Sequence, residues 1–97
     1  MIVCWTLRAL ADLRRIADHI ALANPAAASS LVADTRRQVE QLHRFPLLGR
    51  IGVYQDTREL VVHRNYLVTY RVRADEVQVL QVWHVARNRP RGGAVRV

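Results

Sequence analysis

The chain contains no lysine, a single cysteine and no long apolar run, and each shortage excludes a class of protein. One cysteine, Cys4, rules out an internal disulfide, and its place in a β-rich run predicts a small core residue rather than a nucleophile. The first ten residues lack a basic leader region, and their apolar run is far shorter than the roughly 20 residues of a membrane helix. We therefore expect a cytoplasmic protein with no membrane segment.

The basic residues are all arginines, fifteen of them against eight acidic residues, which gives a formal net charge of +7. A surplus of this sign attracts polyanions or acidic proteins. Arginine adds a planar fork that holds a phosphate or a carboxylate through two hydrogen bonds. The composition therefore indicates a nucleic-acid target or an acidic protein partner. The alternative is a solvated basic surface with no dedicated partner.

The length of 97 residues suits one domain with one core, which we assign to residues 1–90, followed by a flexible tail at 91–97. Residues 2–5 predict a strand, and Thr6 caps the amphipathic helix that follows. Asn24 begins a second helix, which continues to Phe45. The two helices are expected to form a hairpin.

The second half of the chain is typical of strands. Residues 46–56 contain two glycines and a proline without a clear period, which indicates an irregular loop. Three strands follow at 57–63, 66–73 and 76–85, joined by tight turns. Each apolar surface must find a second layer, so we expect an α+β fold. Its small antiparallel sheet (β-α-α-β-β-β) carries the helix hairpin on one face.

The strand at 66–73 alternates apolar residues with a mixed set that includes two arginines. Successive side chains of a strand point to opposite faces, so one set faces the helices and the other faces outward. The outward set is Leu67, Thr69, Arg71 and Arg73. The strand at 76–85 does not separate its apolar and polar residues in this way. We expect the face away from the helices to be open and basic.

Several segments, taken in sequence order, carry a more specific signal: FPLLGR at the end of the second helix, RELVV, NYLVTYRV and VLQVWHVAR in the strands. Together they resemble the RelE/ParE superfamily of bacterial toxins from type II toxin–antitoxin systems, with more similarity to ParE. The resemblance runs from Ile2 to about Pro90. It implies a toxin held inactive by an acidic, ParD-like antitoxin in a toxin–antitoxin hetero-oligomer.

The resemblance implies one of two activities. RelE-like members are ribosome-dependent endoribonucleases that cut messenger RNA with basic and aromatic residues on the open sheet face. ParE-like members poison DNA gyrase and lack that cluster. An arginine follows the tyrosine in RelE-type proteins, where this chain has Leu67 after Tyr66. Arg87 matches a second nuclease position, and a third, aromatic position falls near Gly92 and Gly93, where a helix is unfavourable.

The leucine at position 67 is typical of ParE-like members, so the sequence favours an inhibitor of DNA gyrase that catalyses no reaction and needs no cofactor. If the chain is instead a messenger RNA interferase, His84 and Arg87 are the candidate catalytic residues, because histidine titrates near neutral pH and arginine holds phosphate. The alternative for His84 is a strand-end histidine hydrogen-bonded to a backbone carbonyl. A third interpretation is a member that binds its antitoxin but no longer harms the cell.

Contacts with the target or the antitoxin are expected from arginines on the open surface and at the strand ends: Arg58, Arg71, Arg73, Arg87 and Arg89. Leu22 and Val32, on the helix hairpin, are expected either to line the antitoxin groove or to belong to the core. The histidines and acidic residues show no metal-site spacing, so we expect no metal.

Overall fold

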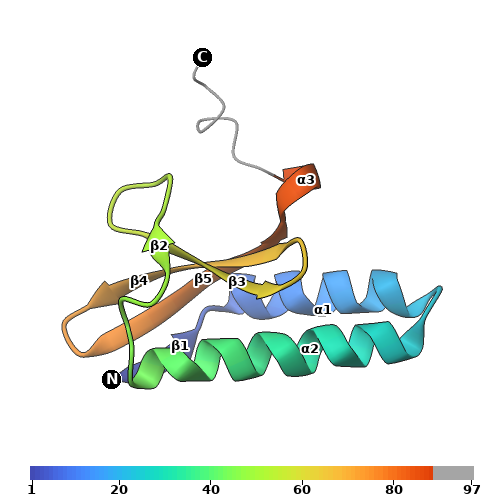
Figure 1. Ribbon diagram of the computed structural model, residues 1–97, viewed down its shortest axis with the longest axis horizontal. Coiled ribbons are helices and arrows are strands. Elements are labelled where there is room, and N and C mark those ends of the chain that lie inside the picture. Colours follow the sequence, from blue (N-terminus) through green and yellow to red (C-terminus); the bar gives the residue numbers. More distant parts are fainter. Residues whose placement is uncertain (89–97) are drawn as a thin grey trace, which may run out of the picture.

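The computed structural model describes residues 1–88, with only the backbone for Arg87 and Asn88, and it has two layers (Figure 1). The strands are β1 (Ile2–Trp5), β2 (Arg50–Ile51), β3 (Arg58–His63), β4 (Tyr66–Arg73) and β5 (Glu76–His84). The helices are α1 (Leu7–Ala21), α2 (Pro25–Glu40) and the short α3 (Val85–Asn88), with a 3₁₀ turn η1 at Gln41–His43. The α+β prediction is confirmed. The tail at 91–97 lies outside the described residues.

The helices begin where the sequence predicts. The Thr6 side chain accepts a hydrogen bond from the N–H of Ala9 at 3.1 Å, and Asn24 accepts one from the N–H of Ala27 at 3.0 Å. These caps satisfy backbone donors that the first turn of a helix leaves unpaired. In residues 1–88, no helix has both the length and the apolar character needed to cross a membrane.

The sheet has five strands in the order β1-β5-β4-β3-β2. Strands β2 to β5 form an antiparallel meander, whereas β1 pairs with β5 in parallel, with Ile2 opposite Glu76. The antiparallel sheet expected from the sequence is confirmed for β2 to β5, and β1 adds one parallel strand at the edge. The segment expected to be irregular contributes the two-residue strand β2. Both details depend on pairing between distant segments, which local sequence pattern does not encode.

The core lies between the helix hairpin and the inner face of the sheet. The alternation of core-facing and outward-facing side chains is interrupted in β5. Thr69 lies opposite Gln81, whereas the next residue, Tyr70, lies opposite Val79. Leu80 is thus an extra residue, and such a β-bulge reverses the alternation of side chains. The core-facing valines of β5 are Val77, Val79 and Val82. The bulge explains why the sequence of this strand does not separate into two faces.

Candidate functional site

The outward face of the sheet is closed at its centre. Leu67 and Thr69 point outward as predicted, yet they are only 1% and 4% exposed, and Trp83, opposite Leu67, is 3% exposed. The indole Nε1–H of Trp83 donates a hydrogen bond of 2.8 Å to the hydroxyl of Thr69. The expected open and basic face is therefore corrected at this point, since its centre is a small buried layer.

Arg71 lies on the outward face within a chain of hydrogen bonds. Its Nε donates to Gln78 at 3.0 Å, and Gln78 donates to Glu76 at 3.1 Å. Glu76 also accepts a 2.8 Å hydrogen bond from the thiol of Cys4. This bond lowers the pKa of Glu76, with help from Gln78, and it raises the pKa of Cys4. Cys4 is held as a thiol, which is the unreactive form of cysteine.

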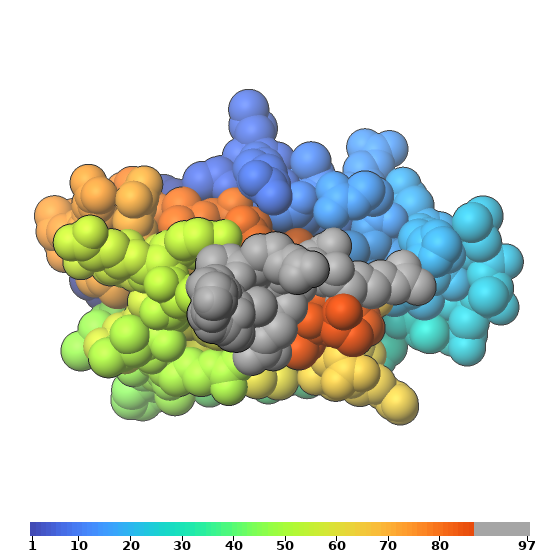
Figure 2. Space-filling model, turned by 90° about the horizontal axis from the view of Figure 1, so that it is seen from above, coloured from blue at the N-terminus to red at the C-terminus, as the bar shows by residue number. Residues whose placement is uncertain are grey.

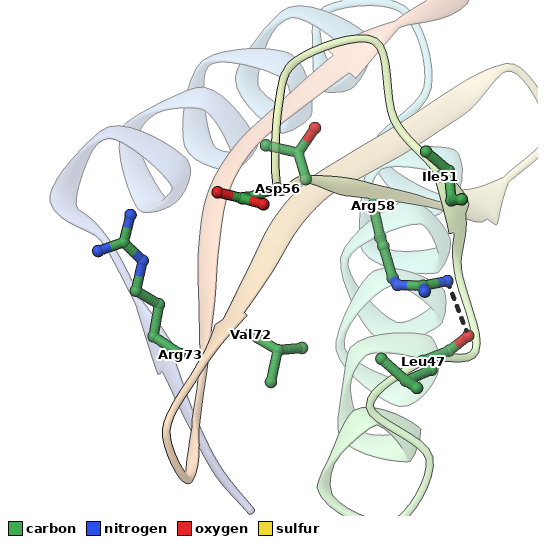
Figure 3. A pocket seen from close by; sticks show the side chains of 7 residues that line it. Leu47, Ile51, Asp56, Arg58, Val72 and Arg73 are labelled. Atoms are coloured by element: carbon green, nitrogen blue, oxygen red, sulfur yellow. Dashed lines mark hydrogen bonds between the residues drawn. The ribbon is translucent and has the colours of Figure 1, made fainter.

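Arg58 and Arg73 line one cleft of about 540 Å³ beside the β2–β3 loop. Figure 3 shows them on neighbouring strands with Val72 between them, and Arg58 reaching towards Leu47. The Nη1 of Arg58 donates to the carbonyl oxygens of Gly49 at 2.8 Å and Leu47 at 3.3 Å. Arg58 therefore supports the loop that follows η1, and two of the cations proposed from the sequence meet in this cleft.

Arg58 does not share the outward face with Arg71. It lies opposite Tyr70 in the register of β3 with β4, and Tyr70 points into the core. Paired residues of neighbouring strands point to the same face, so Arg58 extends from the edge of the helix side. The sequence pattern places arginines on strands, but the pairing register decides which face each of them occupies.

His84 lies at the far end of the sheet from Arg73. It is opposite Tyr66, with ring centroids 4.8 Å apart in an edge-on arrangement, whereas Arg73 is opposite Glu76. The eight residues of β4 span about 25 Å between these positions. Arg73 and His84 thus lie at opposite ends of β4 and cannot share one site.

The Nδ1 of His84 accepts a hydrogen bond of 3.1 Å from the N–H of Ala86 in α3. This contact bonds His84 to the backbone at the end of the strand, but through an N–H group and not through the carbonyl oxygen that the alternative interpretation expected. Arg87 follows in α3, where only its backbone is described, and Arg89 lies outside the described residues. The sequence-based pairing of His84 with Arg87 stays a prediction.

The helix hairpin carries an apolar groove of about 620 Å³ between α1 and α2. Val32 lines this groove, while Leu22 is 85% exposed at the turn between the helices. Val32 lines the groove and also packs against the core, whereas its contact with an antitoxin stays a prediction. Within residues 1–88, no three histidine, cysteine or acidic side chains gather as a metal site would require.

Sequence reasoning missed a second basic cleft, which lies between α1, β5 and the β2–β3 loop. It has a volume of about 410 Å³, and Arg8, Arg15 and Tyr54 line it. The spacing of seven residues between the two arginines is the available signal, since it places them on one side of a helix. Tyr54 comes from a loop on the opposite edge of the sheet, and no local pattern brings it there.

Comparison with known proteins agrees with this architecture. The family model described as "ParE toxin of type II toxin-antitoxin system, parDE" matches residues 3–89. The chain is 36% identical over 85 residues to "Toxin RelE2" of Caulobacter vibrioides, which covers 88% of this chain and 96% of the relative. The fold and these matches define a toxin of a type II toxin–antitoxin system, within the RelE/ParE superfamily. In that superfamily the chain belongs to the ParE toxin family.

Solved structures of known proteins also resemble this chain. A chain described as "Chromosomal ParDE TA system from P. aeruginosa" has a TM-score of 0.77 and 32% identity, over 87% of this chain and 95% of that one. The conserved protein HP0894 from Helicobacter pylori has a TM-score of 0.57 and 14% identity, over 89% of this chain and 96% of that one. The latter similarity concerns the fold alone. Membership in a type II system implies an antitoxin as partner.

Proposed function

We propose that this chain is a ParE-like poison of DNA gyrase, neutralised by a cognate, acidic, ParD-like antitoxin. The match to the ParE family model and the 32% identity to a chain of the ParDE system support this assignment. The observation that carries it is the burial of Leu67, which is 1% exposed at the position where RelE-type nucleases have an arginine.

The chemistry of RNA cleavage explains why this position matters. A nuclease without metal needs a base for the 2′ hydroxyl, a donor to the leaving oxygen and cations around the phosphate. At the centre of the outward face, Leu67, Thr69 and Trp83 supply no cation and no titratable base, and the indole N–H of Trp83 is bonded to Thr69. Arg71, at its margin, is engaged with the neutral side chain of Gln78. This surface supports binding to an enzyme better than catalysis.

The proposal is tested by incubating the purified toxin with supercoiled plasmid, DNA gyrase and ATP, followed by detergent and protease to release trapped breaks. Linear DNA is expected, and it should be absent when gyrase is omitted or when the cognate antitoxin is added first. Intact plasmid at a toxin concentration above that of gyrase contradicts the proposal.

A second candidate function is a RelE-like, ribosome-dependent messenger RNA interferase. The name of the Caulobacter relative, Toxin RelE2, and the sequence spacing of His84 and Arg87 favour it. Primer extension on translated messages would then show codon-phased cuts. Arg87→Ala should abolish the cuts, whereas Arg14→Ala should leave them, because Arg14 lies on the outer side of α1 with 85% of its side chain exposed.

We place contacts with the target or the antitoxin on Arg58, Arg71 and Arg73, together with Arg87 and Arg89. The cleft shared by Arg58 and Arg73 supports this for two of them, because it offers two guanidinium groups beside exposed apolar residues such as Ile51. An acidic antitoxin that covers this cleft would neutralise the charge that meets the target. Such a toxin acts in the cytoplasm, where gyrase and ribosomes work.

A further inference from the structure

The basic cleft on α1 is independent of the arginines considered above. Figure 2 shows the two elements that border it, with α1 in blue along one margin of the outward side and the β2–β3 loop in yellow-green across from it. The cleft encloses about 410 Å³. Its lining side chains include Arg8, Asp12, Arg15, Tyr54, Gln81 and Trp83.

A buried carboxylate organises the cleft. Strand β1 ends with Trp5 opposite Val79, so the edge of β5 beyond that point has no strand beside it in the described sheet. The Oδ2 of Asp12 accepts the N–H of Val82 there at 3.1 Å. A side chain thus pairs a backbone donor that an edge strand would otherwise leave open.

The other oxygen of Asp12 fixes two arginines. Oδ1 accepts from Nε of Arg8 at 3.3 Å and from Nη1 of Arg15 at 3.2 Å. The Asp12 side chain is 3% exposed, whereas those of Arg8 and Arg15 are 68% and 63% exposed. The negative charge is therefore buried behind the two cations. The surface that a ligand meets is positive.

The remaining donors suit a phosphate. A guanidinium group has five N–H donors, and each of the two bonds to Asp12 engages one nitrogen. Two guanidinium groups held at neighbouring positions bind phosphate oxygens with little further loss of side-chain freedom. The cleft volume is that of a small-ligand site, so it holds one nucleotide unit rather than a whole duplex.

Tyr54 adds a feature that a carboxylate ligand would not need. It lies on the β2–β3 loop, is 53% exposed and lines the cleft together with the amide side chain of Gln81. Exposed aromatic rings next to arginines are typical of sites that bind single-stranded nucleic acid, where the bases stack on the rings and the cations hold the backbone. The formal net charge of +7 favours the same class of ligand.

We propose that this cleft binds a phosphodiester of single-stranded nucleic acid, with Arg8 and Arg15 on the phosphate and Tyr54 stacked on an adjacent base. Asp12 is a positioning residue that sets the direction of both guanidinium groups. All residues of this site belong to the toxin chain, so the isolated toxin should bind the ligand. It does not depend on whether gyrase or messenger RNA is the target of the toxin.

The test measures fluorescence anisotropy of a labelled twelve-nucleotide oligothymidine as purified toxin is added at several salt concentrations. Arg15→Gln is expected to weaken binding on the order of tenfold and to reduce the slope of log affinity against log salt by about 1. Arg14→Gln is the matched control: it removes the same charge from the same helix, but Arg14 pairs with the exposed Asp18. It should change the affinity less than twofold.

Tyr54 provides a second, independent variant that leaves Asp12 and its partners untouched. Tyr54→Leu should weaken binding on the order of tenfold with an unchanged salt slope, and Tyr54→Phe should bind like the wild type, because the ring alone supports stacking. Circular dichroism establishes that each variant is folded.

Two outcomes would overturn the proposal. Equal weakening by Arg14→Gln and Arg15→Gln would show that net charge alone attracts the oligonucleotide. Loss of binding to a labelled polyglutamate peptide in Arg15→Gln, with oligonucleotide binding intact, would assign the cleft to an acidic protein.

Discussion

The backbone N–H of Gly49 donates a hydrogen bond of 2.8 Å to the hydroxyl of Tyr70, which in turn donates to the carbonyl oxygen of Pro46 at 2.7 Å. A Cβ on Gly49 would lie 2.8 Å from the Tyr70 ring, so the close approach requires glycine. Burial is the main cause that raises the pKa of Tyr70. One buried phenol thus anchors the loop whose carbonyls hold Arg58.

Removing that hydroxyl should destabilise the protein. In Tyr70→Phe, the N–H of Gly49 and the carbonyl of Pro46 lose their buried partner, which costs about 1–3 kcal/mol in the free energy of unfolding. Urea titration followed by tryptophan fluorescence measures the change. Tyr66→Phe, half-buried on the same strand, is the control and should cost less than about 0.5 kcal/mol. Equal stability of Tyr70→Phe and the wild type would contradict the anchoring role.

Asp12 should contribute more to stability than Asp18, the other aspartate of α1. Asp12→Ala leaves the Val82 N–H unpaired at the edge of β5 and removes a charge-assisted hydrogen bond, so we expect a loss of roughly 1.5–3 kcal/mol. Asp18→Ala is the matched control, since the Asp18 side chain is 74% exposed. The same urea titration compares the two variants. Similar losses in both would show that the contact with β5 adds nothing.

Thr35 offers a stabilising substitution. Its side chain is fully buried in α2, and within the part of the chain that the structure describes its hydroxyl has no hydrogen-bond partner. Thr35→Val replaces that hydroxyl with a methyl group of similar shape, which removes an unpaired polar atom and should raise the free energy of unfolding by about 1 kcal/mol. Thermal melting is the measurement. A lower midpoint than the wild type would mean that the hydroxyl has a partner in solution.

The sequence allowed the order of elements and both helix caps to be predicted, because these depend on local pattern: Thr6 and Asn24 precede apolar runs of helical period. The bulge at Leu80 could not be predicted. It depends on the register of β5 against β4, which packing across the whole sheet decides. The parallel direction of β1 likewise depends on its pairing with β5, where Ile2 lies opposite Glu76. The sequence of β1 alone does not encode this direction.

The candidate site likewise combines features that local sequence pattern predicts with features that depend on long-range packing. Alternation along β4 predicted the outward direction of Arg71, but alternation says nothing about what covers Leu67 and Thr69. The hydrogen bond of Trp83 to Thr69 joins residues of two strands, and only the pairing register brings them together. The basic cleft was missed for a similar reason, because Tyr54 meets α1 through the tertiary fold.

The contact of Asp34 with His63 and Arg37 should make stability depend on pH. Asp34 accepts hydrogen bonds of 2.7 Å from Arg37 and from His63, and these bonds, that of Arg37 first, lower its pKa in the folded state. A lowered folded-state pKa means that the unfolded chain binds the proton more tightly. The stabilisation is therefore complete well above the unfolded pKa of about 4 and is lost as the pH falls through the folded value.

The variant Asp34→Asn cannot gain this stabilisation. We expect its difference from the wild type in the free energy of unfolding to shrink as the pH falls below about 4. Urea titrations between pH 3 and 7 measure it. Arg37→Gln removes the largest cause of the shift, so in that background the difference should be smaller and should be lost completely at a higher pH. A difference that grows on acidification would refute the sign of the argument.

The burial of Leu67 predicts the effect of replacing it with the arginine that RelE-like nucleases have at this position. Leu67→Arg restores the residue type of RelE-like toxins, but the position is 1% exposed, so the guanidinium would have to be buried beside Trp83 or would displace it. We expect a loss of roughly 3–5 kcal/mol in the free energy of unfolding and no gain of ribonuclease activity.

Val61→Arg is the control, since Val61 lies opposite Leu67 on the same face and is 55% exposed. It should cost less than about 1 kcal/mol. A stable Leu67→Arg protein that cuts translated messages would show that a single side chain separates the two activities, and that the buried layer is not the barrier.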